Sequence, residues 1–172
     1  MRYIKLYEDF SFNRITSNPK IKKVICDSYL ETAIWACETN NPHLENKTIY
    51  DFTDNAIEQA KEEIRWFIDS AFELLDSDEV FDDVSYTSIG HDLWLSRNHE
   101  GSGFFDRSEY DDETLNILKV LSHKLDDISV EADNNNDKLY FDMYSEKYKD
   151  FDISEYKEKL ELERTAKKYN VG

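Results

Sequence analysis

The spacing of apolar residues predicts three to four helices. Apolar side chains recur at helical spacing over 18–38, where an asparagine and a proline make a favourable start, and over 53–75 after a threonine cap. Further helices are expected over 111–125 and 154–169. In the second helix, most acidic residues are expected on the solvated face opposite the apolar one: Glu58, Glu62, Glu63, Asp69 and Glu73.

Other segments alternate in the manner of β-strands. Residues 86–98 are expected to form a strand that returns over 103–106 after a turn, which gives a first β-hairpin. A second hairpin is expected over 128–143, because its central Asp/Asn residues tolerate left-handed backbone conformations. Residues 2–12 are expected to form a weak strand or an extended arm. The pattern predicts an α+β fold with three to four helices packed on a small antiparallel sheet of two β-hairpins.

Length and composition indicate how this fold is organised. A chain of 172 residues predicts a single domain over 1–172, with 145–172 as a peripheral C-terminal helical arm. The two cysteines, Cys26 and Cys37, are interpreted as buried apolar residues in a reducing compartment. No apolar run approaches a membrane span, and the charged N-terminus does not resemble a signal peptide. We therefore expect a soluble cytoplasmic protein with no membrane contact.

Charge is spread unevenly along the chain. The formal net charge is −17, yet residues 1–50 carry seven lysines and arginines against six aspartates and glutamates. Within 69–113 there are two basic residues and fourteen acidic ones. Such a field repels nucleic acids and anionic membranes and favours basic partners. A surface that only keeps the protein soluble is the alternative explanation.

The residue types that carry chemistry are concentrated in one segment, Gly90 to Arg107. It holds three of the chain's four glycines and two of its four histidines. The segment combines flexible backbone with imidazole, guanidinium, carboxylate and large aromatic groups. Its motif positions are Gly90, His91, Asp92, Trp94, Arg97, Asn98, Gly101, Gly103, Phe104, Asp106 and Arg107.

These motif positions resemble an uncharacterised family of small phage and plasmid proteins. That family carries the signature G-H-D-[FL]-W-L-[ST]-R-N-x-x-G-x-G-F-[FW]-D-R, and the order of elements around the segment is similar. The family turn commonly reads N-G-H-G, whereas His99 here sits one place earlier. The acidic chain after Met143 also departs from the family. The resemblance implies an accessory protein of a mobile element and transfers no activity.

Two interpretations of the segment stay open. In the structural one, aromatic residues pack on a hairpin while Arg97 and Arg107 form ion pairs with Asp92 or Asp106. In the enzymatic one, a small hydrolase or metal-binding enzyme uses a histidine base, an orienting carboxylate and an anion-holding arginine, with His91, Asp92, Arg97 and His99 as its catalytic residues. Adjacent strand residues point to opposite faces, which argues against a dyad of His91 and Asp92. No zinc-ligand spacing is present, so we expect no metal and no cofactor.

The leading functional hypothesis is a non-enzymatic inhibitor that binds a host protein with a basic, DNA-binding surface. Closely spaced carboxylates imitate the charge of duplex DNA, which suits anti-restriction or anti-CRISPR activity. Direct binding to nucleic acid is not expected. The candidate partner-binding residues are Asp69, Glu73, Asp76, Asp78, Glu79, Asp82, Asp83, Glu109, Asp111, Asp112 and Glu113.

Overall fold

The computed structural model describes residues 15–75, 77, 80–133, 135 and 137–169. The arm expected over 2–12 lies outside this part of the chain. The described part is mostly helical with one small antiparallel sheet, so an α+β fold is confirmed. Besides the helical residues 15–17, it contains five α-helices and four 3₁₀-helices instead of three to four helices. Its elements are α3 (Pro19–Glu38), η1 (Pro42–Leu44), η2 (Ile49–Asp51), α4 (Asp54–Leu75), α5 (Tyr86–Arg97), η3 (Gly103–Asp106), α6 (Asp112–His123), β1 (Val130–Ala132), β2 (Leu139–Phe141), η4 (Lys147–Asp150) and α7 (Ile153–Tyr169).

Four α-helices form where the apolar pattern predicts them, and a side chain caps the start of each; at α7 the Asp152 carboxylate accepts from the backbone N–H of Glu155 at 2.9 Å. The Asn18 side chain accepts hydrogen bonds from the backbone at the start of α3. The Thr53 hydroxyl accepts from the third residue beyond it as α4 begins. Asp111 caps α6 through a 2.7 Å bond from the backbone N–H of Thr114. These bonds satisfy N–H groups that the first turn of a helix leaves unpaired.

The expected strand over 86–98 is wrong, because this segment is helix α5. Its start is capped by Ser85, whose hydroxyl accepts from the backbone N–H of Ser88. Eight of its twelve residues are buried, and these include Asp92, Ser96 and Arg97. A helix that is buried on most sides, and that buries polar residues, lacks the single apolar stripe by which amphipathic helices are recognised.

The first expected hairpin is therefore absent, since residues 103–106 form the 3₁₀-helix η3. Gly103 begins it at φ +47°, and a Cβ there would lie 2.2 Å from the Ser96 hydroxyl on α5. Only glycine allows this close approach of η3 to α5. The second hairpin does form, as β1 and β2 pair antiparallel with Val130 opposite Phe141.

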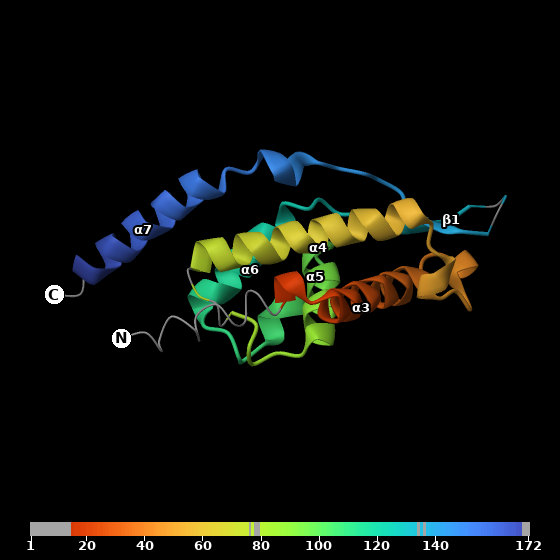
Figure 1. Ribbon diagram of the computed structural model, residues 1–172, viewed down its shortest axis with the longest axis horizontal. Helices are drawn as coiled ribbons and strands as arrows, with labels where there is room; N and C mark the ends of the chain where they lie inside the picture. Colours follow the sequence, from red (N-terminus) through yellow and green to blue (C-terminus); the bar gives the residue numbers. More distant parts are fainter. Residues whose placement is uncertain (1–14, 76, 78–79, 134, 136, 170–172) are drawn as a thin grey trace.

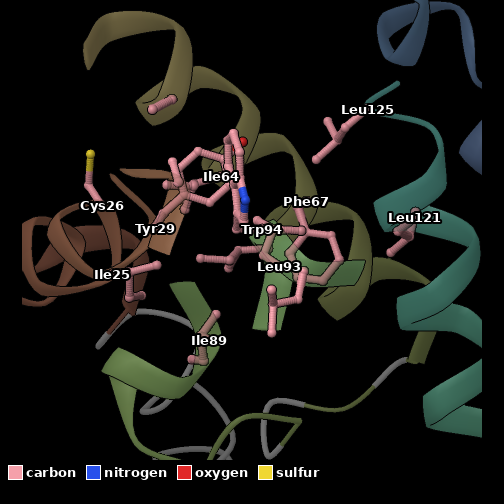
Figure 2. Packing of buried hydrophobic residues seen from close by; sticks show 14 of the residues in the cluster. Ile25, Cys26, Tyr29, Ile64, Phe67, Ile89, Leu93, Trp94, Leu121 and Leu125 are labelled. Carbon is pink, nitrogen blue, oxygen red and sulfur yellow. The ribbon is translucent and has the colours of Figure 1, made fainter. Parts of the chain in front are cut away.

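The helices pack around a buried aromatic and aliphatic core. Figure 1 shows α4 running past α3, α5 and α6, with α7 at one end of the molecule and β1 at the other. Figure 2 shows Trp94 of α5 beside Tyr29 and Phe67, which belong to α3 and α4. The rings of Tyr29 and Trp94 meet edge to face, with centroids 5.2 Å apart. This helix-rich core, and not the two-stranded sheet, is the centre of the fold.

Helix α5 can lie at the centre because Gly90 lets α3 approach closely. A Cβ on Gly90 would lie 2.2 Å from the carbonyl oxygen of Ile25 and 2.8 Å from the backbone nitrogen of Tyr29. No side chain fits between the two helices at this point. The first glycine of the motif is thus a packing requirement.

The C-terminal segment crosses α4 before it forms α7. Its aromatic residues cover Trp66 of α4, whose ring centroid lies 5.1 Å from that of Tyr148 and 6.5 Å from that of Phe151. Leu160 is the buried residue of α7, while Leu162 is 71% exposed. No helix in the described ranges is both long enough and apolar enough to cross a membrane.

Candidate functional site

Arg97, the last residue of α5, lies at the centre of a buried hydrogen-bond network. Its side chain is 0% exposed, and Nη1 donates to Glu63 Oε2 at 2.5 Å and to the Tyr29 hydroxyl. Nε and Nη2 donate to the carbonyl oxygens of Leu125 and Asp126 at 2.5–3.0 Å. All five N–H donors of the guanidinium are therefore used. Arg97 has none left to hold a substrate anion, as the enzymatic interpretation requires.

The same contacts correct two expectations about charge. Arg97 pairs with Glu63, and not with Asp92 or Asp106. The apolar pattern predicts Glu63 on the solvated face of its helix, but this residue is 1% exposed. The interpretation of Arg97 as an ion-pair anchor is confirmed, with a buried partner in place of a solvated one.

The remaining atoms of the network are also paired. Gln59 Nε2 donates to Glu63 Oε1 at 3.0 Å and to the carbonyl oxygen of Met143 at 3.1 Å. Burial raises the pKa of the Tyr29 phenol, which keeps its hydroxyl protonated. The network joins α3, α4, α5 and the segments that flank the hairpin. It holds these elements together at the centre of the protein.

Asp92 is the centre of a second group of charged residues on α5, which lies nearer the surface than the Arg97 network. Arg107 binds its carboxylate through two hydrogen bonds, from Nε at 2.6 Å and from Nη2 at 3.0 Å. The Asp92 side chain is 4% exposed and that of Arg107 is 30% exposed. The expected pairing of Arg107 with Asp92 is thus confirmed, and it holds η3 and the following loop against α5.

His91 and Asp92 are in contact, contrary to the expectation from a strand. His91 Nδ1 lies 3.0 Å from Asp92 Oδ1, since neighbouring side chains on a helix diverge less than those on a strand. The His91 ring stacks on Trp35 with centroids 6.4 Å apart, and Trp35 is 63% exposed. A His–Asp contact therefore exists at the surface, but the Asp92 carboxylate is already held by Arg107.

The second histidine of the segment lies in a different environment. His99 follows α5 at φ +54°, and its ring centroid lies 4.1 Å from that of His123. Burial, and then the charge of His99, lower the pKa of His123. His91 lies within α5, whereas His99 lies beyond its last residue, Arg97. In the described part of the chain, no group of three or more His, Cys, Asp or Glu residues is placed to hold a metal ion.

The other motif residues mainly support local structure. Asn98 ends α5 by donating to the Trp94 carbonyl at 3.2 Å, and its Oδ1 accepts from the backbone of Ile128 at 2.8 Å. The ring of Phe104 stacks on Phe67 with centroids 5.5 Å apart. Gly101 sits at φ +53° in the turn after α5, and Asp106 is exposed at the end of η3.

Three of the candidate partner-binding acids, Glu109, Asp111 and Glu113, line one surface hollow of about 380 Å³. Ser77 and Val80 line it from one side and residues 109–111 from the other, together with Glu113 and Arg164. The candidate acids that are exposed are Asp69, Glu73, Asp82, Asp83, Glu109, Asp111, Asp112 and Glu113. Asp76, Asp78 and Glu79 lie outside the described residues.

Three of the candidate acids differ from the others in role or place. Asp111 caps α6, and its bond from Thr114 lowers the pKa of its carboxyl group. Glu113 Oε1 pairs with Arg164 Nε of α7 at 2.5 Å. Asp69 lies at a different cavity, between α3 and α4. The acids that share the hollow are thus a subset of those expected.

Comparisons of the chain with protein-family models, with curated proteins and with solved structures find no match in any of the three.

Proposed function

We propose that this protein is a non-enzymatic accessory protein of phage or plasmid type that binds and inhibits a host protein in the bacterial cytoplasm. Its partner presents a basic, DNA-binding surface. The acidic face, which we define as the exposed acids Glu73, Asp82, Asp83, Glu109, Asp111, Asp112 and Glu113, competes with DNA for that surface. Restriction enzymes and CRISPR effectors are the kinds of target that this chemistry suits. Neither direct nucleic-acid binding nor membrane binding belongs to the proposal.

The observation that carries the proposal is the internal use of positive charge. Arg97 and Arg107 are the two basic residues of 69–113, and they pair with Glu63 and Asp92, which are buried. Arg97 therefore offsets none of the exposed carboxylates of this stretch, and the first partner of Arg107 is Asp92, with a weaker charge interaction with Glu109. Glu109, Asp111 and Glu113 also line one hollow, in which Arg164 pairs with Glu113. Such a surface attracts basic groups over about a Debye length, roughly 8 Å at physiological salt.

The geometry does not join the four catalytic residues of the enzymatic alternative in one site, and of these it brings only His91 and Asp92 into contact. Arg97 is enclosed by protein groups, so its guanidinium is not open to a substrate. His91 lies within α5 against Trp35, whereas His99 lies beyond the end of that helix against His123. The segment expected to form the hairpin of this alternative is a helix followed by a 3₁₀-helix.

A charge-matched pair of variants tests the proposal. The first neutralises four exposed acids of the face: Glu73→Gln, Asp83→Asn, Glu109→Gln and Asp112→Asn. The second neutralises four exposed acids of α7: Glu155→Gln, Glu158→Gln, Glu161→Gln and Glu163→Gln. Asp111 and Glu113 are left intact, because they cap α6 and pair with Arg164. Both variants have the same net charge, so a difference between their partner affinities depends on where the neutralised acids lie and not on total charge.

The assay is capture of host proteins from bacterial lysate on each purified variant, followed by competition with duplex DNA. We expect the wild type and the α7 variant to retain the same DNA-binding protein, and the face variant to lose at least about tenfold in affinity. Duplex DNA should displace that protein from the wild type. Equal retention by both variants, or retention that duplex DNA does not reduce, would contradict DNA mimicry.

A further inference from the structure

Trp35 of α3 exposes a large aromatic surface that the core does not use. The residue is 63% exposed, whereas Trp94 is fully buried. The Trp35 ring lies against the His91 imidazole of α5, with centroids 6.4 Å apart and planes 27° from parallel. No lysine or arginine of the described chain lies over the indole, although lysines lie over other rings. An indole is the aromatic group that attracts a cation most strongly, so this open face suits a cationic ligand.

His91 presents a hydrogen-bond acceptor beside the indole. Its Nδ1 lies 3.0 Å from Asp92 Oδ1, and the Asp92 carboxylate also accepts two bonds from Arg107. A carboxylate accepts hydrogen bonds and donates none, so Nδ1 of His91 carries the proton. The lone pair of the neutral imidazole is then on Nε2. The side chain is 43% exposed, and Nε2 has no hydrogen-bond partner among the described residues.

The charge around Trp35 is negative. Glu31 lies four residues before Trp35 and Glu38 three residues after it, so both are its neighbours on the surface of α3. Both glutamates are exposed, and within the described residues neither forms an ion pair. Arg107 is the basic residue joined to this group, and Asp92 balances its charge. The two glutamate charges are therefore uncompensated, and they favour a cation over an anionic ligand.

We propose that the surface formed by Glu31, Trp35, Glu38 and His91 binds an arginine side chain of a partner protein. The guanidinium stacks on the open indole face, donates a hydrogen bond to His91 Nε2 and is attracted by the two glutamates. Arginine fits better than lysine, because its planar group stacks and donates at once, whereas an ammonium is a strongly hydrated point charge.

This surface is independent of the acidic face and of DNA mimicry. It lies on α3 and α5 and contains none of the residues that define the acidic face. Tryptophan and arginine are also the residues most enriched among the anchors that dominate protein–protein binding energies. Because its test uses no host protein, failure to capture a DNA-binding partner would leave this arginine site unaffected.

The test is an NMR titration of the full-length, ¹⁵N-labelled protein with the capped tripeptide acetyl-Gly-Arg-Gly-amide. The chain has three tryptophans and therefore three indole N–H signals. The Trp35 signal should shift saturably with a Kd of about 1 mM, while the signal of the buried Trp94 stays in place. The citrulline peptide has nearly the same shape and no charge, and it should bind at least about tenfold more weakly. The lysine peptide should bind about threefold more weakly.

Variants of the surface separate these contacts, with binding followed on the backbone amides of α3. Trp35→Leu should weaken binding at least about fivefold. His91→Phe keeps a ring beside Trp35 and removes the acceptor, and it should weaken binding about threefold. Glu31→Gln combined with Glu38→Gln should weaken it about threefold at low salt. Because none of these residues is buried, each variant should keep the urea midpoint of the wild type.

The matched control is Glu158→Gln combined with Glu161→Gln on α7. These residues are exposed, and the change in net charge is the same as in the double variant of α3. The control should leave the affinity for the arginine peptide unchanged. Equal weakening by the two double variants would show a general attraction to an acidic protein and would contradict a site at Trp35.

Three further outcomes would overturn the proposal. They are a Trp35 indole signal that does not shift saturably, equal affinities for the arginine and citrulline peptides, and an affinity that Trp35→Leu leaves unchanged. A fourth is a dimer in sedimentation experiments that Trp35→Glu converts to a monomer, because Trp35 would then face a second copy of the chain.

Discussion

Replacing Arg97 with methionine is the most direct test of the buried network. Methionine retains much of the side chain's length and removes all five donors. The change leaves the Glu63 carboxylate 1% exposed without its cation, and leaves the carbonyl oxygens of Leu125 and Asp126 without their arginine donors. Each of these groups lost its water on folding, so none regains a partner in the variant.

The expected decrease in the free energy of unfolding of Arg97→Met follows from these lost interactions. Removing one member of a buried ion pair costs about 3–5 kcal/mol. The two carbonyl groups place Arg97→Met in the upper part of that range, about 4–5 kcal/mol. Against a total stability of about 5–15 kcal/mol for a domain, this is a large fraction. For a chain of this length, the melting temperature should fall by about 8–20 °C.

The assay is urea unfolding monitored by tryptophan fluorescence, since Trp94 is fully buried beside Tyr29. Glu63→Met and the double variant complete a thermodynamic cycle. If the two charges interact as the 2.5 Å contact indicates, the double variant should lose about 2–3 kcal/mol less than the sum of the single losses. Arg164→Met is the control, because its ion pair with Glu113 is partly exposed and should contribute no more than about 1 kcal/mol.

Two results would refute this reasoning. One is a loss of less than about 1 kcal/mol in Arg97→Met, comparable to the surface control. The other is additivity in the cycle, which would mean that Arg97 and Glu63 are each important but do not act on one another.

Further predictions concern helix packing and pH. Gly90→Ala should destabilise the protein by about 1–3 kcal/mol or more, measured by the same urea titration, because its Cβ would clash with the Ile25 carbonyl of α3. Ser102→Ala, in the turn nearby, should stay within about 0.5 kcal/mol of wild type. The folded protein lowers the pKa of His123 from its ordinary 6.5, so the unfolded chain binds this proton first. The urea midpoint should therefore fall as pH decreases below about 6.5, and His123→Gln should reduce that slope. A slope that His123→Gln leaves unchanged would assign the pH dependence to other groups.

The helices that bury one face could be predicted from the sequence. α4 and α6 carry apolar residues on one side, and the cap residues at their starts, Thr53 and Asp111, identify where they begin. The hairpin of β1 and β2 was also predictable, because the aspartate and asparagine residues between its strands tolerate the left-handed backbone that tight turns need. These signals are local, and each can be read within a few residues of the element that it specifies.

Helix α5 could not be predicted in this way, because its environment is set by distant parts of the chain. Arg97 is polar in the sequence but buried in the fold, since its partner Glu63 lies 34 residues away. Gly90 is typical of a helix breaker, yet it is needed where α5 crosses α3. The sequence did contain a weak indication that Glu63 is buried, because Ala60, Ile64 and Phe67 surround it on the buried side of α4.

The charged residues of the Gly90–Arg107 motif have a different role from the exposed acids of the proposed binding surface. A segment rich in histidine, arginine and aspartate suggests a reactive site, but here Arg97 and Arg107 pair with internal carboxylates. Changes at these two arginines should therefore reduce partner capture only as far as they reduce the folded fraction. Changes at exposed acids such as Glu109 and Asp112 should reduce capture while leaving the urea midpoint in place. Comparing capture with stability for both kinds of variant distinguishes a packing motif from a binding surface, because only the acidic face predicts that the two measurements diverge.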